Sequence, residues 1–371
     1  MSLFRSHVSD VWQDPVVRDR LSWYYNVLRD LKPAKFLMCK QIACSQDPRM
    51  MTEAQLWDKH EKLHTEFRRA LNRMRKDELP NESVKRPEFS FLDVKMELLN
   101  RILRKCTFCE WRCRVDRVEG KRKGACHLGS EARVASFFLH QGEEPPLVDP
   151  HGSGTIFFAS CTFRCVFCQN WDISQHPDAG APVSPRELSL MIKSLRSEGA
   201  ANINFVGGEP TPNLHLITEA LNLTTANVPI LWNSNMYLTP EAMQILEDLV
   251  DIWLPDFKWG NDLCAMKYSR IIRYFDVVSR NHIMAYENGD MIIRHLVMPG
   301  HLECCTKPIL NWIAEKCPRA LVNVMGQYRP EHLVLQEPER YHEIARRLTP
   351  QEITRAQDYA NELGLVWEPV A

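Results

Sequence analysis

From about residue 154 onward, short apolar runs alternate with longer segments whose apolar positions recur at helical spacing. The short runs are rich in β-branched and aromatic residues, as buried strands are. The predicted strands cover residues 155–160, 202–207, 229–233, 251–257, 275–279 and 291–298. The predicted helices between and after them cover residues 184–198, 213–225, 239–249, 261–273 and 306–316. Alternation of this kind predicts parallel β/α units.

Six β/α units suit a partial barrel better than a complete eight-fold barrel, which needs ~250 residues. The residues before this region are polar and helical in pattern, with predicted helices around 15–31, 53–77 and 91–105. The charged run 76–89 contains two prolines and predicts a linker. We therefore expect an α/β protein built on a partial (β/α)6 TIM-like barrel. Its predicted parts are a helical N-terminal region (1–105), a small Cys-rich metal-binding segment (106–140), the barrel (141–330) and a C-terminal helical extension (331–371).

Composition places the chain among globular proteins. Its 371 residues are 44% hydrophobic and 25% charged, which excludes a disordered or fibrous chain. No stretch approaches the roughly 18–20 apolar residues of a membrane helix, and MSLFRSHVSDVWQD lacks the apolar core of a secretory signal. Lysine plus arginine (46) balances aspartate plus glutamate (47), which does not favour nucleic acid as a partner. We expect a cytoplasmic protein, away from membranes, with a protein or small-molecule substrate.

The chain contains 13 cysteines, and their spacing is more informative than their number. A disulfide framework is not expected in a long chain without a signal peptide, whereas dense cysteine groups in a reducing compartment indicate metal sites. One group lies at residues 106–126 and another at 161–168. The cysteines outside these groups are Cys39, Cys44, Cys264, Cys304, Cys305 and Cys317, for which the pattern suggests no role.

The second group reads Cys161-Thr-Phe-Arg-Cys165-Val-Phe-Cys168. Three thiolates can hold three corners of a four-iron cluster and leave the fourth iron open for a ligand. Three buried core cysteines are the structural alternative. Zinc is a poorer match, because a closed tetrahedral site needs a fourth ligand nearby. The group follows a predicted strand at the expected carboxyl edge of the barrel, where active sites of this architecture lie, and this favours a functional metal centre.

The C-x3-C-x2-C spacing resembles the signature of the radical S-adenosylmethionine (radical SAM) superfamily. Within that superfamily the chain resembles the branch similar to pyruvate formate-lyase activating enzyme, most of whose members are uncharacterised iron–sulfur proteins. The resemblance covers about residues 140–330. Its further motifs, in chain order, are GEEPP (142–146), Gln169–Asn170, GGEP (207–210), WNSNMY (232–237), PDFK (255–258), VMPGH (297–301) and NVMGQYRP (323–330).

The resemblance implies a [4Fe-4S] cluster held by Cys161, Cys165 and Cys168, with S-adenosylmethionine on the open iron. One electron, from a donor such as a flavodoxin or ferredoxin, would cleave the cofactor to methionine and a 5′-deoxyadenosyl radical. That radical would take hydrogen from a protein, as in glycyl-radical activation or another modification, or from a small molecule. The cofactor supplies the difficult chemistry, while the protein supplies position and exclusion of water.

Gly207, Gly208 and Glu209 follow the second predicted strand. Glycine lets backbone approach a ligand closely, and by resemblance Glu209 would bind the amino group of the cofactor. An ordinary strand-to-helix turn is the structural alternative. Asn233, Ser234 and Asn235 follow the third strand and offer donors and acceptors suited to ribose hydroxyls.

Taken alone, Asn233, Ser234 and Asn235 also suit a turn before Pro240. Asp256 and Lys258 resemble an Asp-Leu-Lys element of the activating enzymes, with phenylalanine in place of leucine here. Lys258 would pair with the cofactor carboxylate, and a surface ion pair is the alternative.

Arg294 lies within an apolar strand, where a charge requires a partner, and a guanidinium facing the barrel interior would hold the cofactor carboxylate. His295 would then point the opposite way and be structural.

The upstream group is Cys106, Cys109, Cys113 and Cys126. Four thiolates could close around tetrahedral zinc or hold an auxiliary iron–sulfur cluster, and the spacing does not decide between the two metals. Family relatives carry a similar upstream set. His127 is adjacent and is either a substitute ligand or only a neighbour.

The segment His60-Glu61-Lys62-Leu63-His64 matches H-E-x-x-H, a zinc-binding pattern on helices. The surrounding HEKLHTEFRR is strongly charged and no third ligand is evident nearby, so we interpret the match as coincidental and expect a solvated helix face.

Two classes of function remain from the sequence. The leading one is a radical SAM enzyme, and the alternative is a non-catalytic protein that binds zinc or an iron–sulfur cluster for interaction or sensing. The GGEP segment and the polar strand ends favour the enzyme, because a structural metal protein needs no cofactor pocket.

Overall fold

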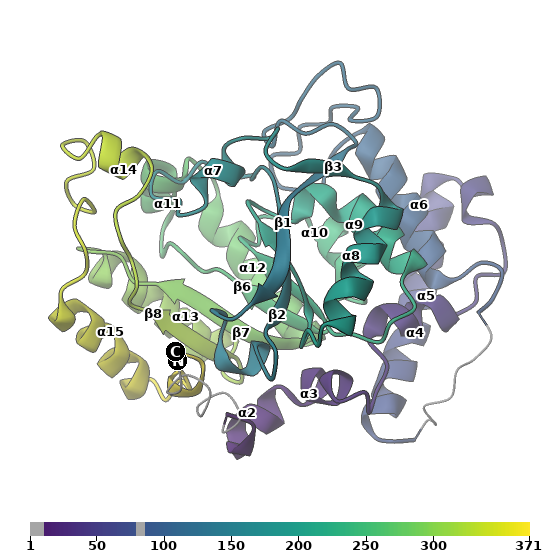
Figure 1. Cartoon of the computed structure of the whole chain (residues 1–371), viewed down its shortest axis with the longest axis horizontal. Coiled ribbons are helices and arrows are strands. Elements are labelled where there is room, and N and C mark those ends of the chain that lie inside the picture. The colour runs from purple at the N-terminus through teal and green to yellow at the C-terminus, as the bar shows by residue number, and fades with distance from the viewer. Residues whose placement is uncertain (1–10, 79–85) are drawn as a thin grey trace.

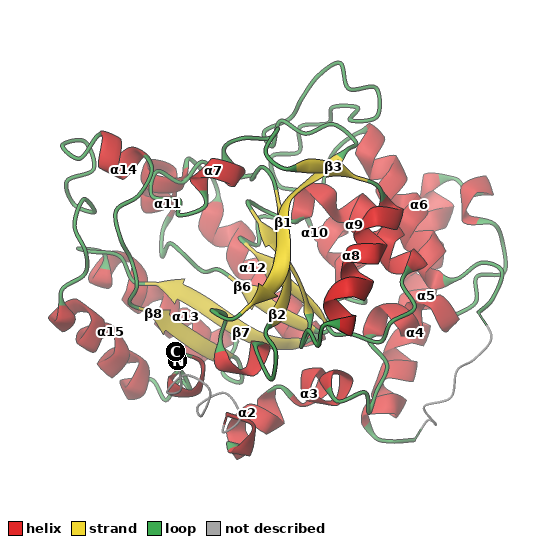
Figure 2. Ribbon diagram, viewed as in Figure 1, coloured by secondary structure: helices red, strands yellow, loops and turns green. Residues whose placement is uncertain are grey.

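The computed structural model describes residues 11–78 and 86–371, and its strands form an eight-stranded sheet in the order β3-β1-β2-β4-β5-β6-β7-β8 (Figure 2). The strands β2 and β4 to β8 run parallel, while β1 pairs antiparallel with β2 and β3. The strands are β1 (Ala132–His140), β2 (Ser153–Phe158), β3 (Ala181–Val183), β4 (Ile203–Gly207), β5 (Ile230–Ser234), β6 (Ile252–Pro255), β7 (Asp290–Leu296) and β8 (Leu321–Met325). The six parallel strands confirm the predicted partial barrel.

The helices that alternate with these strands are α7 (Trp171–Ser174), α8 (Pro185–Ser197), α9 (Leu214–Leu223), α10 (Pro240–Leu246), α11 (Asp262–Ser269), α12 (Tyr274–Asn288) and α13 (Lys307–Lys316). Local sequence fixes where several of them begin. Ser184 and Glu187 form a capping box at the start of α8, and the Thr239 hydroxyl accepts the Ala242 amide at the start of α10. Helix α8 therefore begins directly after β3, and α10 begins after a short loop behind β5.

One predicted strand is wrong. Residues 275–279 lie inside α12, because their apolar side chains bury one face at helical spacing together with Ala285 and Tyr274. Burial on that face overrides the strand propensity of the two valines. The sixth parallel strand is instead β8. The sequence pattern predicted none of the three strands β1, β3 and β8.

The helices of the N-terminal region lie in two places: three of them cover the barrel beside α8 and α9, and the other two lie below the start of β7 (Figure 1). Its helices are α2 (Pro15–Arg20), α3 (Ser22–Leu28), α4 (Lys35–Gln41), α5 (Glu53–Arg75) and α6 (Phe91–Arg104). Helix α5 packs on α6, and α6 packs on α9 of the barrel. Residues 79–85 of the predicted linker lie outside the described residues, as do residues 1–10 at the N-terminus.

After β8 the chain continues into α14 (Leu333–Gln336) and α15 (Pro350–Glu362), which packs on α13 and β8. A π-helix, η5, covers Leu302–Thr306 just before α13. Short 3₁₀ turns lie at Val11–Gln13, Pro48–Met50, Pro145–Leu147, Thr211–Asn213 and Glu368–Val370. Over residues 11–78 and 86–371, no helix combines the length and the apolar character needed to cross a membrane.

The expectation of a solvated face around H-E-x-x-H is also wrong. His60 is buried, and Lys95 of α6 contacts its Nε2 at 2.9 Å. His64 lies 3.0 Å from a carboxylate oxygen of Asp248, which also accepts a 2.8 Å bond from Lys95. Because an ammonium already faces His60, the two histidines do not form a zinc pair. They attach the N-terminal helices to the barrel instead.

Candidate functional site

A pocket of about 250 Å³ opens at the carboxyl edge of the parallel strands. The loops after successive strands meet there, so residues far apart in the chain share one wall. Every predicted cluster or cofactor residue of the barrel lines this pocket: Cys161, Cys165, Cys168, Gly207, Gly208, Glu209, Asn233, Ser234, Asn235, Asp256, Lys258 and Arg294. A larger hollow of about 540 Å³ lies where β7 and β8 begin and contains none of them.

The three cysteines lie on the loop between β2 and α7. Hydroxyl groups approach two of the sulfurs: Ser269 lies 3.1 Å from Cys165, and Ser174 lies 3.2 Å from Cys168. Burial raises the pKa of the Cys165 thiol to about 12. A thiolate there therefore needs a bound cation, and this donor set fits an iron centre that deprotonates its ligands.

Close backbone packing explains the two glycines after β4. Gly207 has φ +117°, and a Cβ atom at this position would lie 2.2 Å from backbone atoms of Phe158. A Cβ on Gly208 would lie 1.8 Å from the carbonyl oxygen of Ser160, next to the cysteine loop. Only glycine allows these two loops to approach so closely. The segment thus fits against the cysteine loop and also carries Glu209 into the pocket.

Glu209 is buried and connects the loops after β4 and β5. Its Oε1 accepts hydrogen bonds from the Thr211 hydroxyl (2.5 Å) and the Ser234 hydroxyl (2.7 Å), and its Oε2 accepts one from the Asn235 amide (2.9 Å). Burial raises the pKa of this carboxyl, although these donors oppose the shift. Oε2 has one protein donor and can accept a further hydrogen bond from a ligand.

Two half-buried cations share the carboxylate of Asp256. Lys258 Nζ lies 2.5 Å from Oδ2, and Arg294 Nε donates to Oδ1 at 2.9 Å. Arg294 also donates to Asn233 Oδ1 at 2.5 Å. Burial alone would raise the pKa of Asp256, but Arg294 and Lys258 lower it below its usual value. The charges are therefore paired across the ends of β5, β6 and β7, and not on the surface.

Sequence reasoning missed several residues of this site. Glu143 is buried, lies 3.6 Å from Arg294 and accepts a 3.0 Å bond from Asn204. Its neighbour Glu144 accepts a 2.9 Å bond from Asn323. The motif at 142–146 contained both glutamates, but it gave no indication of their partners. The pocket wall also includes Leu296, Met325 and Gln327, which lie around β7 and the unpredicted β8.

His295 points away from the pocket, as expected from strand alternation. Its Nδ1 lies 2.8 Å from the Phe257 carbonyl oxygen, and its Nε2 lies 2.9 Å from the Thr306 hydroxyl. Burial lowers its pKa to about 4, so the ring is neutral and structural.

The upstream cysteine segment packs directly on the loop of the three cysteines. The Trp111 indole donates to the Thr162 carbonyl at 2.9 Å, and Arg164 donates to the Ala125 carbonyl at 2.7 Å. The Ala125 amide in turn lies 3.3 Å from the Cys113 sulfur. His127 is exposed. Among the described residues, the sulfur atoms of this upstream cysteine set do not all lie within 4.8 Å of one another.

Known proteins place this architecture in a family. Residues 155–313 match the model of the radical SAM superfamily. The chain is 41% identical to the uncharacterized protein MJ0674 of Methanocaldococcus jannaschii over 352 residues, which is 93% of this chain and 98% of that protein.

Two solved structures are more distant. One is Streptococcus suis SuiB bound to the precursor peptide SuiA (13% identity, TM-score 0.40, 55% of this chain), of which this chain spans 43%. The other is TYW1 with a lysine-pyruvate adduct bound (13% identity, TM-score 0.37, 56% of this chain and 73% of that one). The family match includes the three-cysteine loop and most of the residues that line the pocket. The chain therefore belongs to the radical SAM superfamily.

Proposed function

We propose that the pocket binds a [4Fe-4S] cluster together with S-adenosylmethionine and that the protein is a radical enzyme acting on a protein or small-molecule substrate. One observation carries the proposal: three cysteines, buried carboxylate and amide groups and two half-buried cations line the same pocket. A radical SAM cluster supplies reductive cleavage of the cofactor to a 5′-deoxyadenosyl radical, which abstracts hydrogen. A protein that used its cysteines only for structure or sensing would need no such lining.

Each group of the chain has a proposed task. Cys161, Cys165 and Cys168 would hold iron, and the backbone at Gly207 and Gly208 would lie along the methionine part of the cofactor. Glu209 would accept the cofactor ammonium at Oε2.

The remaining polar strand ends complete the pocket. Asn233, Ser234 and Asn235 would meet the ribose, and Lys258 with Arg294 would orient the carboxylate. Asp256 would keep these two cations charged and in place.

The upstream set of Cys106, Cys109, Cys113 and Cys126 would hold a second metal centre. A single zinc ion draws its four ligands close together, whereas a cluster separates them by its own iron and sulfide atoms. The absence of a compact donor group among these described thiols supports an auxiliary iron–sulfur cluster over zinc. Its segment contacts the loop of the first cluster, so the two centres would be neighbours.

Membership of the activating-enzyme-like branch, with a flavodoxin or ferredoxin as electron donor, is part of the proposal. So is a cytoplasmic location, which the thirteen free cysteines support because a reducing compartment preserves thiols.

The test is anaerobic turnover of the reconstituted protein with dithionite and S-adenosylmethionine. We expect 5′-deoxyadenosine from the parent protein and none from Cys165→Ala, because that variant loses one cluster ligand. Cys44→Ala is the control, since Cys44 is buried outside the pocket and contacts the Gln46 carbonyl. Undiminished product from Cys165→Ala would refute the assignment, and a parent protein without product would favour the non-catalytic alternative.

A further inference from the structure

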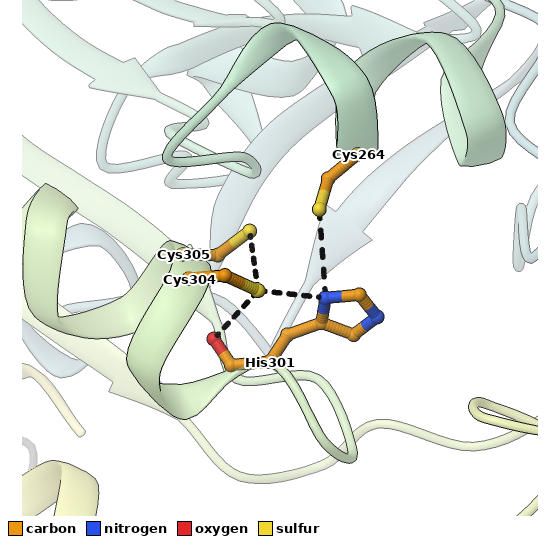
Figure 3. Close-up of side chains that lie close together, drawn as sticks. All are labelled: Cys264, His301, Cys304 and Cys305. Atoms are coloured by element: carbon orange, nitrogen blue, oxygen red, sulfur yellow. Dashed lines mark hydrogen bonds between the residues drawn. The ribbon is translucent and has the colours of Figure 1, made fainter.

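Three cysteines without an evident role in the sequence come together with one histidine at the carboxyl edge of β6 and β7 (Figure 3). Cys264 lies in the first turn of α11, while His301 precedes the π-helix η5, which contains Cys304 and Cys305. Their four donor atoms all lie within 4.8 Å of one another. We propose that a single zinc ion binds here in a tetrahedral site formed by four side chains: Cys264, His301, Cys304 and Cys305.

The distances between the donor atoms fit one ion. The Nδ1 atom of His301 lies 3.6 Å from the Cys264 sulfur and 3.2 Å from the Cys304 sulfur, and the Cys304 and Cys305 sulfurs lie 3.8 Å apart. Tetrahedral zinc, with bonds of ~2.3 Å to sulfur and ~2.0 Å to nitrogen, separates two sulfurs by ~3.8 Å and sulfur from nitrogen by ~3.5 Å. An iron–sulfur cluster would hold its thiolates farther apart.

The surroundings hold these ligands in place, as metal sites require. Asn261 accepts a 2.8 Å bond from the Cys264 amide and directs its own amide group at the Cys305 sulfur, 3.6 Å away. The rings of Trp259 and Tyr268 pack edge-on against the His301 ring, with centroids 5.7 and 5.1 Å away. The imidazole is therefore oriented by packing on two sides.

Backbone geometry gives a second reason to regard the site as built. A Cβ on Gly260 would lie 2.7 Å from the Cys305 Cα, so the loop after β6 packs directly against the π-helix. Single π-helical turns of this kind occur frequently at functional sites. Burial of thiols as small apolar groups does not explain the cluster, because Cys304 is exposed and Cys264 is only half-buried.

The ion would fasten α11 to the loop between β7 and α13, with up to three thiol protons released to solvent and no change of redox state. This site is separate from the pocket, although it lies close behind it. The Trp259 indole, which packs on His301, donates to the Ser269 hydroxyl at 2.8 Å, and that hydroxyl is the partner of Cys165. Zinc here would stabilise the wall behind the cluster loop without contacting S-adenosylmethionine.

Cobalt titration of the full-length, metal-depleted protein tests the proposal, because thiolate-bound tetrahedral Co²⁺ has intense visible and near-ultraviolet bands. We expect Cys264→Ser/Cys304→Ser to bind one equivalent less than the parent and the matched control Cys44→Ser to bind the same number as the parent. The other cysteine groups are unchanged in all three proteins, so they cannot produce the difference. Equal uptake by the parent and the double variant would overturn the proposal.

A second variant covers the case in which the double variant does not fold, which circular dichroism would reveal. His301→Cys keeps four donors, so it should bind the same number of equivalents as the parent while its cobalt bands shift and its sulfur-to-cobalt absorption strengthens. A spectrum unchanged by His301→Cys would also overturn the proposal. Zinc should displace the cobalt and bleach the bands of the parent.

Discussion

At the scale of single residues, Glu209 combines two tasks that the sequence presented as alternatives. Its carboxylate holds the ends of the β4 and β5 loops together through Thr211, Ser234 and Asn235. The same carboxylate faces the pocket and would receive the cofactor ammonium. A turn residue and a binding residue are therefore not exclusive here, because the bonds that hold Glu209 also fix where its free lone pair points.

The two tasks can be separated by substitution. Glu209→Ala should retain the absorbance of the cluster but bind S-adenosylmethionine about ten-fold or more weakly, since a hydrogen bond to a charged group is worth ~1.5–3 kcal/mol. It should also melt earlier, because buried donors lose their acceptor. Calorimetric titration and a melting curve measure the two effects.

The control is Thr211→Val, which removes one donor and keeps the carboxylate. It should lower thermal stability and leave the affinity for S-adenosylmethionine unchanged. An unchanged dissociation constant for Glu209→Ala would contradict the binding role.

At the scale of elements, a buried ionic group attaches the N-terminal helices to the barrel. Lys95 on α6 is fully buried and pairs with Asp248, which lies in the loop between α10 and β6. His64 on α5 reaches the same carboxylate. Burial alone would raise the pKa of Asp248, but Lys95 and His64 lower it well below its usual value. The carboxylate is therefore ionised and depends on both helices.

Removal of one partner from such a pair leaves the other charge buried. Lys95→Met should lower the free energy of unfolding by ~3–5 kcal/mol. Lys62→Met is the matched control, because Lys62 pairs with Asp58 on the exposed face of α5 and its loss should change stability little. Chemical denaturation of both variants measures the difference. Equal losses of unfolding free energy in the two variants would show that the buried pair contributes no more to stability than the exposed pair.

The same group predicts a pH dependence. The hydrogen bond to Asp248 is the largest cause that raises the pKa of His64, and burial opposes it. Glu247 also faces His64, and burial raises the pKa of Glu247 to about 7. A raised histidine pKa stabilises the fold below ~6.5, and this contribution disappears as the pH rises through the folded-state value. The stability lost in His64→Gln should therefore be larger at pH 6 than at pH 9, as melting temperatures would show. A difference independent of pH would contradict this.

At the scale of the whole molecule, three cysteine groups surround the carboxyl edge of one barrel. The upstream segment contacts the cluster loop through hydrogen bonds of Trp111 and Arg164. The group of Cys264, His301, Cys304 and Cys305 lies on the other side of Trp259, which packs on His301. Loops after parallel strands collect at this edge, so separate stretches of chain bring thiols into one region. The architecture thus allows distinct metal centres in close proximity.

Metal analysis can assign the upstream group independently of activity. A variant with alanine at Cys161, Cys165 and Cys168 should retain iron and sulfide at the upstream set, whereas Cys109→Ala/Cys113→Ala should lose that portion. Iron, sulfide and zinc are measured separately in each protein. If the Cys109→Ala/Cys113→Ala protein has the same metal content as the parent, the upstream centre does not exist.

The local pattern of the sequence determined a large part of this protein. Five of the six predicted strands correspond to β2, β4, β5, β6 and β7, because each is a buried apolar run whose periodicity is visible without its neighbours. The residues predicted around the cluster and cofactor line one pocket, because parallel strands bring their carboxyl ends to a common edge. The motif at Cys161–Cys168, together with the further motifs that follow it in order along the chain, identified the superfamily.

Three features were decided only by the tertiary structure: one helix, one buried histidine and one cluster of metal-ligating side chains. Residues 275–279 became part of α12 because packing, and not the strand propensity of valine, set their conformation. His60 became buried because α6 supplies Lys95 against a helix that looked solvated. Cys264 and His301 are 37 positions apart and come together because β6 and β7 are neighbours in the sheet. Such contacts depend on which strands pair, and no local periodicity contains that information.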